Sequence, residues 1–362
     1  MNELIQMNDG LADIKTKSSF IKGFGESRIG GRVENQDNWG SSDTPFGFLI
    51  VVCDGMGGGP SGKLASTLAV ESILKGVEEG NKEEAPTNVL IKAIRQANMD
   101  IILQGEEDMR LKGMGSTCTA VLINEESAIV AHVGDSRVYQ FRGGCKVFRT
   151  FDHSMVFDLV KKKVITEEVA RLSVDSNIIT RALGIKPDLE VEVHEVPYEI
   201  GDRFMLSTDG IHGAIPEKQL ISLATDTKKN LSQCVENIAM TIDNEGVKNG
   251  GGHDNLTVAM IELSANSKKK VKMSKRVKYI FLGLLVICFS CLVLNMCQVF
   301  STEDLPEVTV EKLKEDKKGE WLKTTLKTIK EVYPVEIQKM DSGDSVKIMV
   351  GGIELSKEKV NN

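Results

Sequence analysis

Phe46-Gly-Phe-Leu-Ile-Val-Val-Cys53 is a continuous apolar run, and it leads directly into the turn Asp54-Gly-Met-Gly-Gly-Gly59. The first stretch predicts a buried strand, and the glycines predict that the strand ends at Asp54. A carboxylate at the end of a buried strand is expensive to hold without a counter-charge. A counter-charge near Asp54 is therefore expected.

The segments after this turn group strands with strands and helices with helices. Helical spacing of apolar residues follows first, at residues 63–79 and 87–104. Four short strand-like runs separated by turn residues come next and predict an antiparallel meander, at residues 117–123, 127–133, 136–142 and 146–150. Later strands are expected at 189–196, 203–207 and 255–263, with helices at 217–224 and 231–245. This grouping predicts an α+β domain in which helices cover antiparallel sheets.

Composition and charge restrict the function classes. The chain has 362 residues, of which 41% are hydrophobic and 27% charged, and its net charge is -7. A mildly acidic total argues against a nucleic-acid partner, because such proteins present a basic surface to phosphate. The seven cysteines are odd in number and lack metal-ligand spacing before residue 268, which indicates reduced thiols.

Residues 279–300 form an uncharged, mostly apolar stretch, long enough to cross a bilayer as a helix. Lysines and one arginine crowd residues 268–278, whereas an acidic segment follows the stretch. Because positive residues stay on the cytoplasmic side, we expect a single-pass cell-membrane protein with its N-terminal part in the cytoplasm and its C-terminus outside.

These boundaries predict five parts of the chain. They are an N-terminal tail (1–17), a large folded domain (18–265), a basic linker (266–278), a transmembrane helix (279–300) and a small extracytoplasmic segment (301–362). The last segment shows an amphipathic helix pattern at 320–332 and a strand pair at 335–339 and 345–355. It carries no recognisable chemistry, and both a sensing or docking module and a plain tail remain open.

Four aspartates besides Asp37 fall where strands end or begin. Asp54, Asp135 and Asp209 each follow an apolar strand-like run, and Asp254 precedes one. A single Asp-Gly pair is more often an ordinary turn, but clustered carboxylates repel one another unless a cation neutralises them. An oxygen-rich set of this kind suits Mg²⁺ or Mn²⁺.

The motifs that contain these aspartates resemble a known family, the metal-dependent (type 2C) Ser/Thr protein phosphatases, in its bacterial branch. The matching segments run from residue 20 to 263. They are Arg32-Val-Glu-Asn-Gln-Asp37, Val52-Cys-Asp-Gly-Met-Gly-Gly58, Gly113-Met-Gly-Ser-Thr117, Gly134-Asp-Ser-Arg137, Asp152-His-Ser154, Thr180-Arg-Ala-Leu-Gly184, Leu206-Ser-Thr-Asp-Gly210 and Gly252-His-Asp-Asn-Leu-Thr257. The resemblance implies two antiparallel sheets packed face to face with helices outside (α-β-β-α), followed here by the transmembrane helix.

The resemblance also implies roles for particular residues. Asp54 would bridge two Mn²⁺ or Mg²⁺ ions, with the Gly55 carbonyl on one of them, and Asp209 and Asp254 would complete the protein ligands. Asp135, together with Asp209, would bind a third and weakly held ion. Asp37 would hold a metal-bound water without touching the metal itself. Two ions about 3.5–4 Å apart can activate a shared water for attack on phosphorus.

Arg32 matches the phosphate clamp of the family, since a guanidinium can bind two phosphate oxygens; an ordinary surface arginine is the alternative. Residues 156–177 occupy the place of the family's mobile flap over the site and are the least family-like part. The expected activity is hydrolysis of phosphoserine and phosphothreonine in proteins, with phosphoproteins and a cognate Ser/Thr kinase as partners. A catalytically silent membrane module that binds phosphoproteins is the alternative function.

Overall fold

A computed structural model of the chain describes residues 10–57, 60–264, 335–339, 345–350 and 353–359. The chain divides into two compact units, residues 1–270 and 271–362, which are considered separately. Within the described ranges no helix has the length and apolarity needed to cross a bilayer. The predicted linker, the predicted transmembrane helix and the amphipathic pattern at 320–332 lie outside these ranges.

The first sheet forms around β4 (Gly47–Met56), the apolar run identified in the sequence, whose residues 48–53 are all buried. Its strand order is β10-β7-β6-β4-β3, and the short β5 (Gly115–Ser116) also pairs with β4. The other strands are β3 (Asp37–Thr44), β6 (Cys118–Ile123), β7 (Ala128–Val133) and β10 (Glu192–Val196). All neighbouring pairs are antiparallel, as the turn-punctuated sequence predicts.

The second sheet is also antiparallel, with the order β1-β2-β12-β11-β8-β9. Its strands are β1 (Gly10–Asp13), β2 (Ile21–Arg28), β8 (Arg137–Arg142), β9 (Cys145–Arg149), β11 (Arg203–Ser207) and β12 (Leu256–Leu263). The prediction that residues 1–17 are only a tail is wrong for this part, because β1 pairs with β2 and Ile14 is buried between the sheets.

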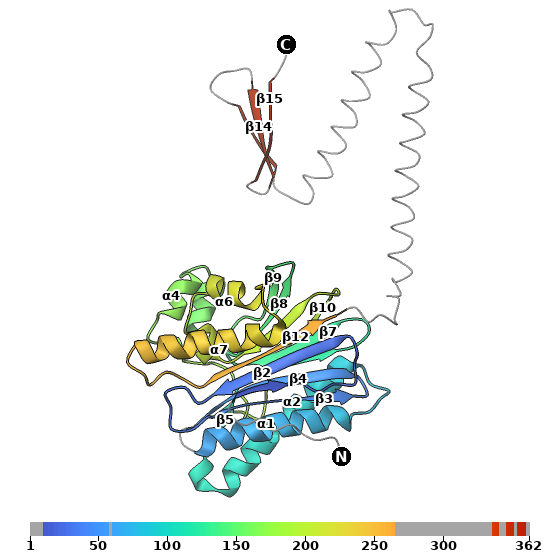
Figure 1. Cartoon of the computed structure of the whole chain (residues 1–362), viewed down its shortest axis with the longest axis vertical. Helices are drawn as coiled ribbons and strands as arrows, with labels where there is room; N and C mark the ends of the chain where they lie inside the picture. Colours follow the sequence, from blue (N-terminus) through green and yellow to red (C-terminus); the bar gives the residue numbers. More distant parts are fainter. Residues whose placement is uncertain (1–9, 58–59, 265–334, 340–344, 351–352, 360–362) are drawn as a thin grey trace, which may run out of the picture. The chain divides into compact units, whose positions relative to one another are not determined.

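The two sheets pack face to face, and each carries helices on its outer face (Figure 1). The helices α1 (Pro60–Glu78) and α2 (Pro86–Glu107) pack on the sheet that contains β4. The helices α5 (Asp209–His212), α6 (Glu217–Ala224) and α7 (Leu231–Lys248) pack on the other sheet. The predicted α+β class, with helices on both sides of an antiparallel sandwich, is confirmed for this unit.

The predicted four-strand meander at 117–150 is wrong in one respect. β6 and β7 belong to one sheet, whereas β8 and β9 belong to the other. The chain crosses between the sheets at Gly134, whose φ of +104° lies in the region that favours glycine. This crossing places Asp135 at the edge of the sheet interface instead of in a hairpin turn.

Two short helices, α3 (Met155–Lys161) and α4 (Glu167–Arg171), form half of the segment predicted to be the flap (residues 156–177). In the second unit, β13 (Val335–Lys339), β14 (Ser345–Val350) and β15 (Ile353–Lys359) form an antiparallel sheet. The predicted strand at 335–339 is confirmed, and the predicted strand at 345–355 is divided into β14 and the start of β15.

Gly25 of β2 and Trp39 of β3 face each other between the two sheets. A Cβ atom at residue 25 would lie 2.3 Å from the indole ring of Trp39, which is itself buried. We therefore expect Gly25→Ala to destabilise residues 1–270 by about 1–3 kcal/mol through overpacking. Urea unfolding of this unit measures the effect.

The control is Trp39→Phe, which removes the outer indole atoms that the new methyl group would meet. Together with Gly25→Ala it should cost less than the sum of the two single changes, because it makes room for the methyl group. Strict additivity of the two free-energy changes would contradict this account of the packing.

Candidate active site

One cavity of about 1020 Å³ collects most of the residues that the sequence singled out. Its lining includes Arg32, Asp54, Gly55, Asp135, Asp209 and Asp254. Asp37 is not part of the lining; it is buried behind the cavity with 2% of its surface exposed. The structure thus brings all seven predicted site residues to one place, with Asp37 in the second layer.

Asp37 and Asp54 are direct cross-strand partners at the end of the β3–β4 ladder. The backbone of Asp54 is held from its other side by Thr117, whose hydroxyl accepts from the Asp54 N–H at 2.9 Å and whose own N–H donates to the Asp54 carbonyl at 2.8 Å. The carboxylate is therefore carried on a strand end that is fixed from two directions.

Gly55 stands where no larger residue fits. A Cβ atom at this position would lie 1.9 Å from the Gly62 carbonyl oxygen and 2.8 Å from the Gln36 carbonyl oxygen. The missing side chain lets three segments of backbone approach one another beside Asp54. A side chain at residue 55 would therefore displace the backbone beside Asp54.

Asp209 is the first residue of α5, a short helix that starts directly after β11. The preceding residue, Thr208, donates from its hydroxyl to Asp37 Oδ2 at 2.9 Å and accepts from the Thr257 N–H at 3.1 Å. Thr208 thus connects the end of β11, the start of β12 and the buried carboxylate of the opposite sheet. Because Thr208 directly precedes Asp209, its hydrogen bond holds Asp37 close to the start of α5.

Asp254 lies just before β12 and is partly exposed. Its Oδ1 accepts from the Asn255 N–H at 2.9 Å, and its Oδ2 accepts from Arg32 Nη2 at 2.7 Å. The Asn255 amide donates in turn to the carbonyls of Ile29 and Glu34, on both sides of Arg32. The arginine predicted to clamp phosphate is therefore ion-paired with a carboxylate predicted to bind metal.

Burial and mutual repulsion raise the pKa values of the clustered carboxyl groups. Burial is the main cause in every case. It raises the pKa of Asp37 to about 7, against the hydrogen bonds from Thr257 and Thr208, and the pKa of Asp209 to about 6, with Asp254 adding to the effect. The pKa values of Asp54 and Asp135 lie well above their usual range for the same reason. A cation would relieve this stored repulsion.

The donor set fits a hard divalent cation. The groups around the cavity are carboxylate and carbonyl oxygens, which Mg²⁺ and Mn²⁺ prefer. Asp37 Oδ1 is buried and has no hydrogen-bond partner among the described residues. A buried carboxylate oxygen without a donor is costly unless an ion or an ordered water meets it. The site therefore supports metal binding on the evidence of its own side chains.

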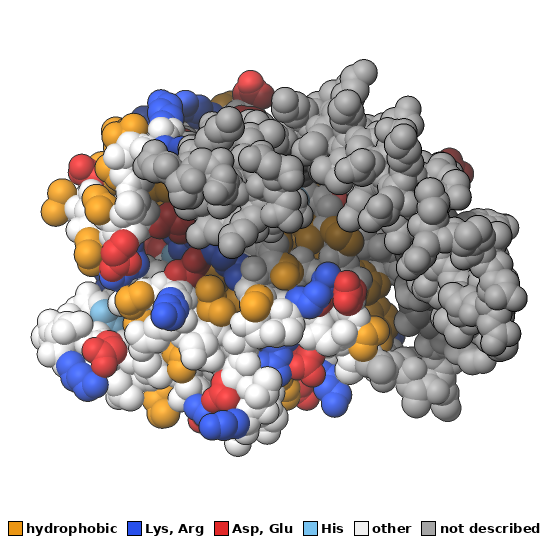
Figure 2. All heavy atoms as spheres, turned by 90° about the horizontal axis from the view of Figure 1, so that it is seen from above, with side chains coloured by type: hydrophobic (Ala, Val, Ile, Leu, Met, Phe, Trp, Pro, Cys, Tyr) orange, Lys and Arg blue, Asp and Glu red, His pale blue; other side chains and the backbone are white. Residues whose placement is uncertain are grey.

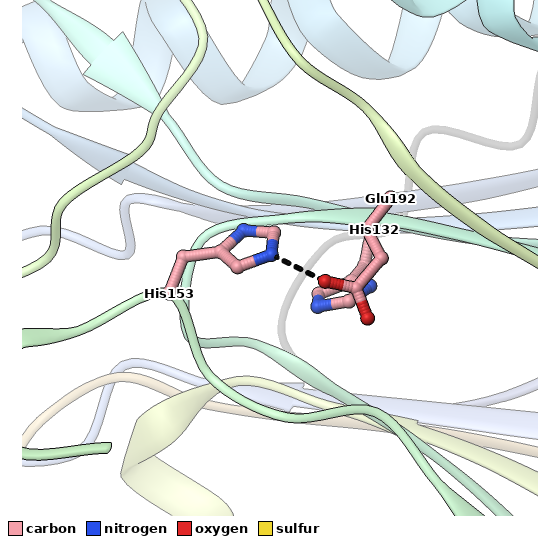
Figure 3. Close-up of side chains that lie close together, drawn as sticks. All are labelled: His132, His153 and Glu192. Atoms are coloured by element: carbon pink, nitrogen blue, oxygen red, sulfur yellow. Dashed lines mark hydrogen bonds and ion pairs between the residues drawn. The ribbon is translucent and has the colours of Figure 1, made fainter. Parts of the chain in front are cut away.

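A second cluster of possible ligands lies outside this cavity, formed by His132, His153 and Glu192 (Figure 3). His153 Nδ1 accepts from the Gly134 N–H at 3.2 Å, and its Nε2 contacts Glu192 Oε2 at 3.0 Å. The hydrogen bond to His153 is the main cause that lowers the pKa of Glu192. Burial lowers the pKa of His132 to about 4.

The two imidazoles of this cluster are stacked, with centroids 4.4 Å apart and planes only 18° from parallel. A metal ion must lie close to the plane of each histidine that binds it, and nearly parallel rings direct their lone pairs side by side instead of toward one point. The cluster is better explained as a hydrogen-bonded support for the Gly134 crossing, which carries Asp135. His132 itself is completely buried in β7.

Several residues that hold the site together were not identified from the sequence. Thr117, Thr208 and Thr257 anchor the strand ends, and Asn255 ties Arg32 to Asp254. Their only sequence signal is their place next to a site aspartate or within its motif. Asn177 and Ile179, at the end of the flap, also line the cavity.

Comparisons with known proteins agree with this geometry. A family model described as protein phosphatase 2C matches residues 24–249, more than half of the chain. The serine/threonine phosphatase stp of Listeria monocytogenes is 33% identical over 71% of this chain and 97% of its own length. The family match ends at residue 249, before the C-terminal segment.

Solved structures show the same fold. The serine/threonine phosphatase of S. agalactiae has a TM-score of 0.61 and 30% identity, covering 68% of this chain and 100% of its own. The catalytic domain of the phosphatase PstP, solved with two manganese ions, has a TM-score of 0.56 and 26% identity over 68% of this chain and 99% of its own. The chain belongs to the bacterial branch of the protein phosphatase 2C family and is a metal-dependent protein Ser/Thr phosphatase.

Proposed function

We propose that the cavity is a binuclear Mn²⁺ or Mg²⁺ centre that hydrolyses phosphoserine and phosphothreonine in proteins at the cytoplasmic face of a membrane. The observation that carries the proposal is the convergence of Asp54, Asp135, Asp209 and Asp254 on one cavity, backed by a buried Asp37 with an unpartnered oxygen. Asp54, the Gly55 carbonyl, Asp209 and Asp254 would hold the two ions, and Asp135 with Asp209 a third. When bound, the ions supply an activated water and stabilise negative charge on phosphate.

The protein's own groups bind and orient the substrate. Arg32 is about half exposed at the mouth of the cavity, and its partner Asp254 is a proposed metal ligand. With Asp254 compensated by a cation, the Arg32 guanidinium would be free to donate hydrogen bonds to two phosphate oxygens in a fork. Asp37, held by Thr208, would keep the attacking water in place through its unpartnered Oδ1.

The surface suits a protein substrate better than a nucleic acid. On the face drawn in Figure 2, acidic, basic and hydrophobic side chains of the described residues are interspersed. The net charge of the chain is -7. A nucleic-acid partner requires a basic stripe along the phosphate backbone. Phosphorylated proteins, including a Ser/Thr kinase of the same cell, are the partners that we infer.

The membrane attachment rests on the sequence. The uncharged stretch 279–300 and the basic residues before it support a single span with the catalytic unit inside the cell and residues 301–362 outside. A phosphatase held in this way would act on proteins near the inner membrane surface. Strands β13, β14 and β15, which follow residue 300, would then lie on the outer side of the membrane.

Phosphate release tests the proposed activity directly. Residues 1–270 should release phosphate from a phosphothreonine peptide, but not from the matching phosphotyrosine peptide, in Mn²⁺ and not in EDTA. Asp209→Asn should lower kcat/KM at least about 100-fold, because it removes a charged ligand. Asp188→Asn, the same change at an exposed aspartate, should leave the rate within twofold. Equal rates for both variants would disprove the metal role of Asp209.

The raised pKa of Asp37 predicts a pH-dependent stability of the metal-free unit. With a pKa of about 7 against an ordinary 3.8, this group keeps a proton in the folded state that the unfolded chain has lost. Stability is therefore lost as pH rises through this window. In EDTA, Asp37→Asn should raise Tm relative to the unsubstituted unit by at least about 3 °C more at pH 8 than at pH 5.5.

Mn²⁺ provides the second arm of this experiment. A cation replaces the proton at high pH, so the Tm of the unsubstituted unit should rise more on Mn²⁺ addition at pH 8 than at pH 5.5. If Asp37→Asn shifts Tm equally at both pH values, the carboxyl group is not protonated in the metal-free state and the electrostatic account fails.

Labelling of single cysteines tests the orientation in the membrane. Cys145 is exposed on the catalytic unit, and residues 301–362 contain no cysteine. In intact cells an impermeant maleimide should label an Asn361→Cys variant and should reach Cys145 only after lysis. Labelling of Cys145 in intact cells would reverse the orientation, and recovery of the chain in the soluble fraction would contradict the span.

A further inference from the structure

The flap (residues 156–177) has a small apolar core of its own. Val156, Phe157 and Ala170 are buried together, with Val160 and Ile165 packed against them. Five other apolar side chains of the flap are at least 40% exposed, namely Leu159, Val164, Val169, Leu172 and Val174. Three buried side chains give little hydrophobic stabilisation. The position of the flap must therefore depend on its contacts with the rest of the catalytic unit.

Arg149, at the end of β9, makes the strongest of these contacts. Its Nη1 donates to Glu167 Oε2 of α4 at 2.5 Å, and its Nη2 donates to Glu167 Oε1 at 3.0 Å. The same Nη1 donates to Glu217 Oε1 of α6 at 2.7 Å. One guanidinium thus joins the flap to a helix of the body, in a forked arrangement that fixes direction as well as distance.

The charge of Arg149 is well buried, with 7% of the residue exposed. Its guanidinium lies over the rings of Phe151 and Phe157, 4.8 Å and 5.7 Å from their centroids, and its Nε has no partner among the described residues. Removal of one partner from a buried ion pair leaves an uncompensated charge. Loss of Glu167 would remove two of the three hydrogen bonds between Arg149 and carboxylates and would leave Glu217 to compensate the buried charge.

A second contact connects α4 to the metal-site helix. Arg171 donates from Nη1 to the Gly213 carbonyl at 3.1 Å, and the Gly213 N–H donates to the Asp209 carbonyl at 2.7 Å. Gly213 caps α5, of which Asp209 is the first residue. Movement of α4 would therefore displace Gly213, whose N–H is hydrogen-bonded to the backbone of Asp209.

The flap also forms a wall of the site. Val174, Ser176 and Asn177 line a second cavity of about 520 Å³, which reaches Asp135 and Asp209, and Asn177 lines the main cavity as well. The ends of the flap are held by the Met155 N–H, which donates to the Ile178 carbonyl at 3.1 Å. Because α4 ends at Arg171, its position determines the position of the residues that follow it and line the cavities.

We propose that Arg149 is a positioning residue: by binding Glu167 and Glu217 together it fixes the flap wall beside the cavity and so presents a preformed surface to protein substrates. The proposal rests on the proposed function for the reaction itself. It concerns the part of a protein substrate that extends beyond the phosphate group, because none of the described residues of α3 and α4 lines the main cavity.

Two glutamates in successive positions of α4 provide a matched pair of variants. Glu167→Gln breaks the bridge to Arg149, whereas Glu168→Gln removes the ion pair with Arg171 inside the flap and leaves the Arg149 bridge and the donor of the Arg171–Gly213 hydrogen bond in place. Both are made in the full-length chain in detergent with Mn²⁺. Trypsin cleavage at the exposed Lys161, Lys162 and Lys163, located by fragment mass, reports on the flap without reference to catalysis.

We expect Glu167→Gln to be cleaved about tenfold faster at these lysines than Glu168→Gln, with Tm values of the two within about 2 °C. Its KM for a phosphothreonine peptide should rise about tenfold at nearly constant kcat, while KM for p-nitrophenyl phosphate stays within about twofold. Arg149→Lys, which keeps the charge but loses the fork, should lie between Glu167→Gln and the unsubstituted chain.

Equal cleavage rates, or equal peptide KM values, for Glu167→Gln and Glu168→Gln would overturn the proposal. A parallel rise of KM for p-nitrophenyl phosphate would also overturn it, because the effect would then lie in the phosphate site itself. If the unsubstituted chain releases no phosphate, the proposed function fails, whereas the cleavage rates still decide whether Arg149 fixes the flap.

Discussion

Repulsion between buried carboxyl groups is the constraint on which the structure of the catalytic unit depends. Asp37, Asp54, Asp135 and Asp209 lie close enough, and deep enough, that burial and their neighbours raise every one of their pKa values. Carboxyl groups that repel one another would move apart if they were all held by flexible loops. Asp37, Asp54 and Asp209 are instead placed at a strand end or at the first turn of a helix, and Asp135 lies in the short crossing between β7 and β8.

Both sheets contribute to this cluster. Asp37 and Asp54 belong to one sheet, Asp209 and Asp254 flank strands of the other, and Asp135 lies where the chain passes between them. The hydrogen bond from Thr208 to Asp37 spans the interface. The packing of the sandwich, including the Gly25–Trp39 contact, is therefore part of what determines the distances within the site. A mutation in the apolar interface between the sheets can therefore change the reaction rate without replacing a metal-binding residue.

Much of this arrangement was predictable from the sequence because its signals are local. The apolar run before Asp54 and the order of the Asp-containing motifs indicated the fold class, the strand ends and the seven site residues. The features that the sequence did not predict depend on contacts between segments that are distant along the chain. Residues 117–150 show the same alternation whether they form one meander or two hairpins on different sheets, and only the packed structure distinguishes the two. The pair Arg32–Asp254 and the bridge Glu167–Arg149–Glu217 likewise join residues whose spacing carries no signal.

The direction of β12 has a mechanical consequence. Asp254 precedes its first residue, and Ser264, at the other end, donates to the Phe20 carbonyl and is the last residue described in this unit. Eight residues of extended chain separate Leu256 from Leu263 by roughly 23 Å. The strand is paired with β2 along its whole length and with β11 from Val258 to Glu262. A pull or twist applied to the chain after Ser264 would therefore be shared among the hydrogen bonds of three strands before it reached the carboxylates, so the catalytic centre is insulated from strain in whatever follows it.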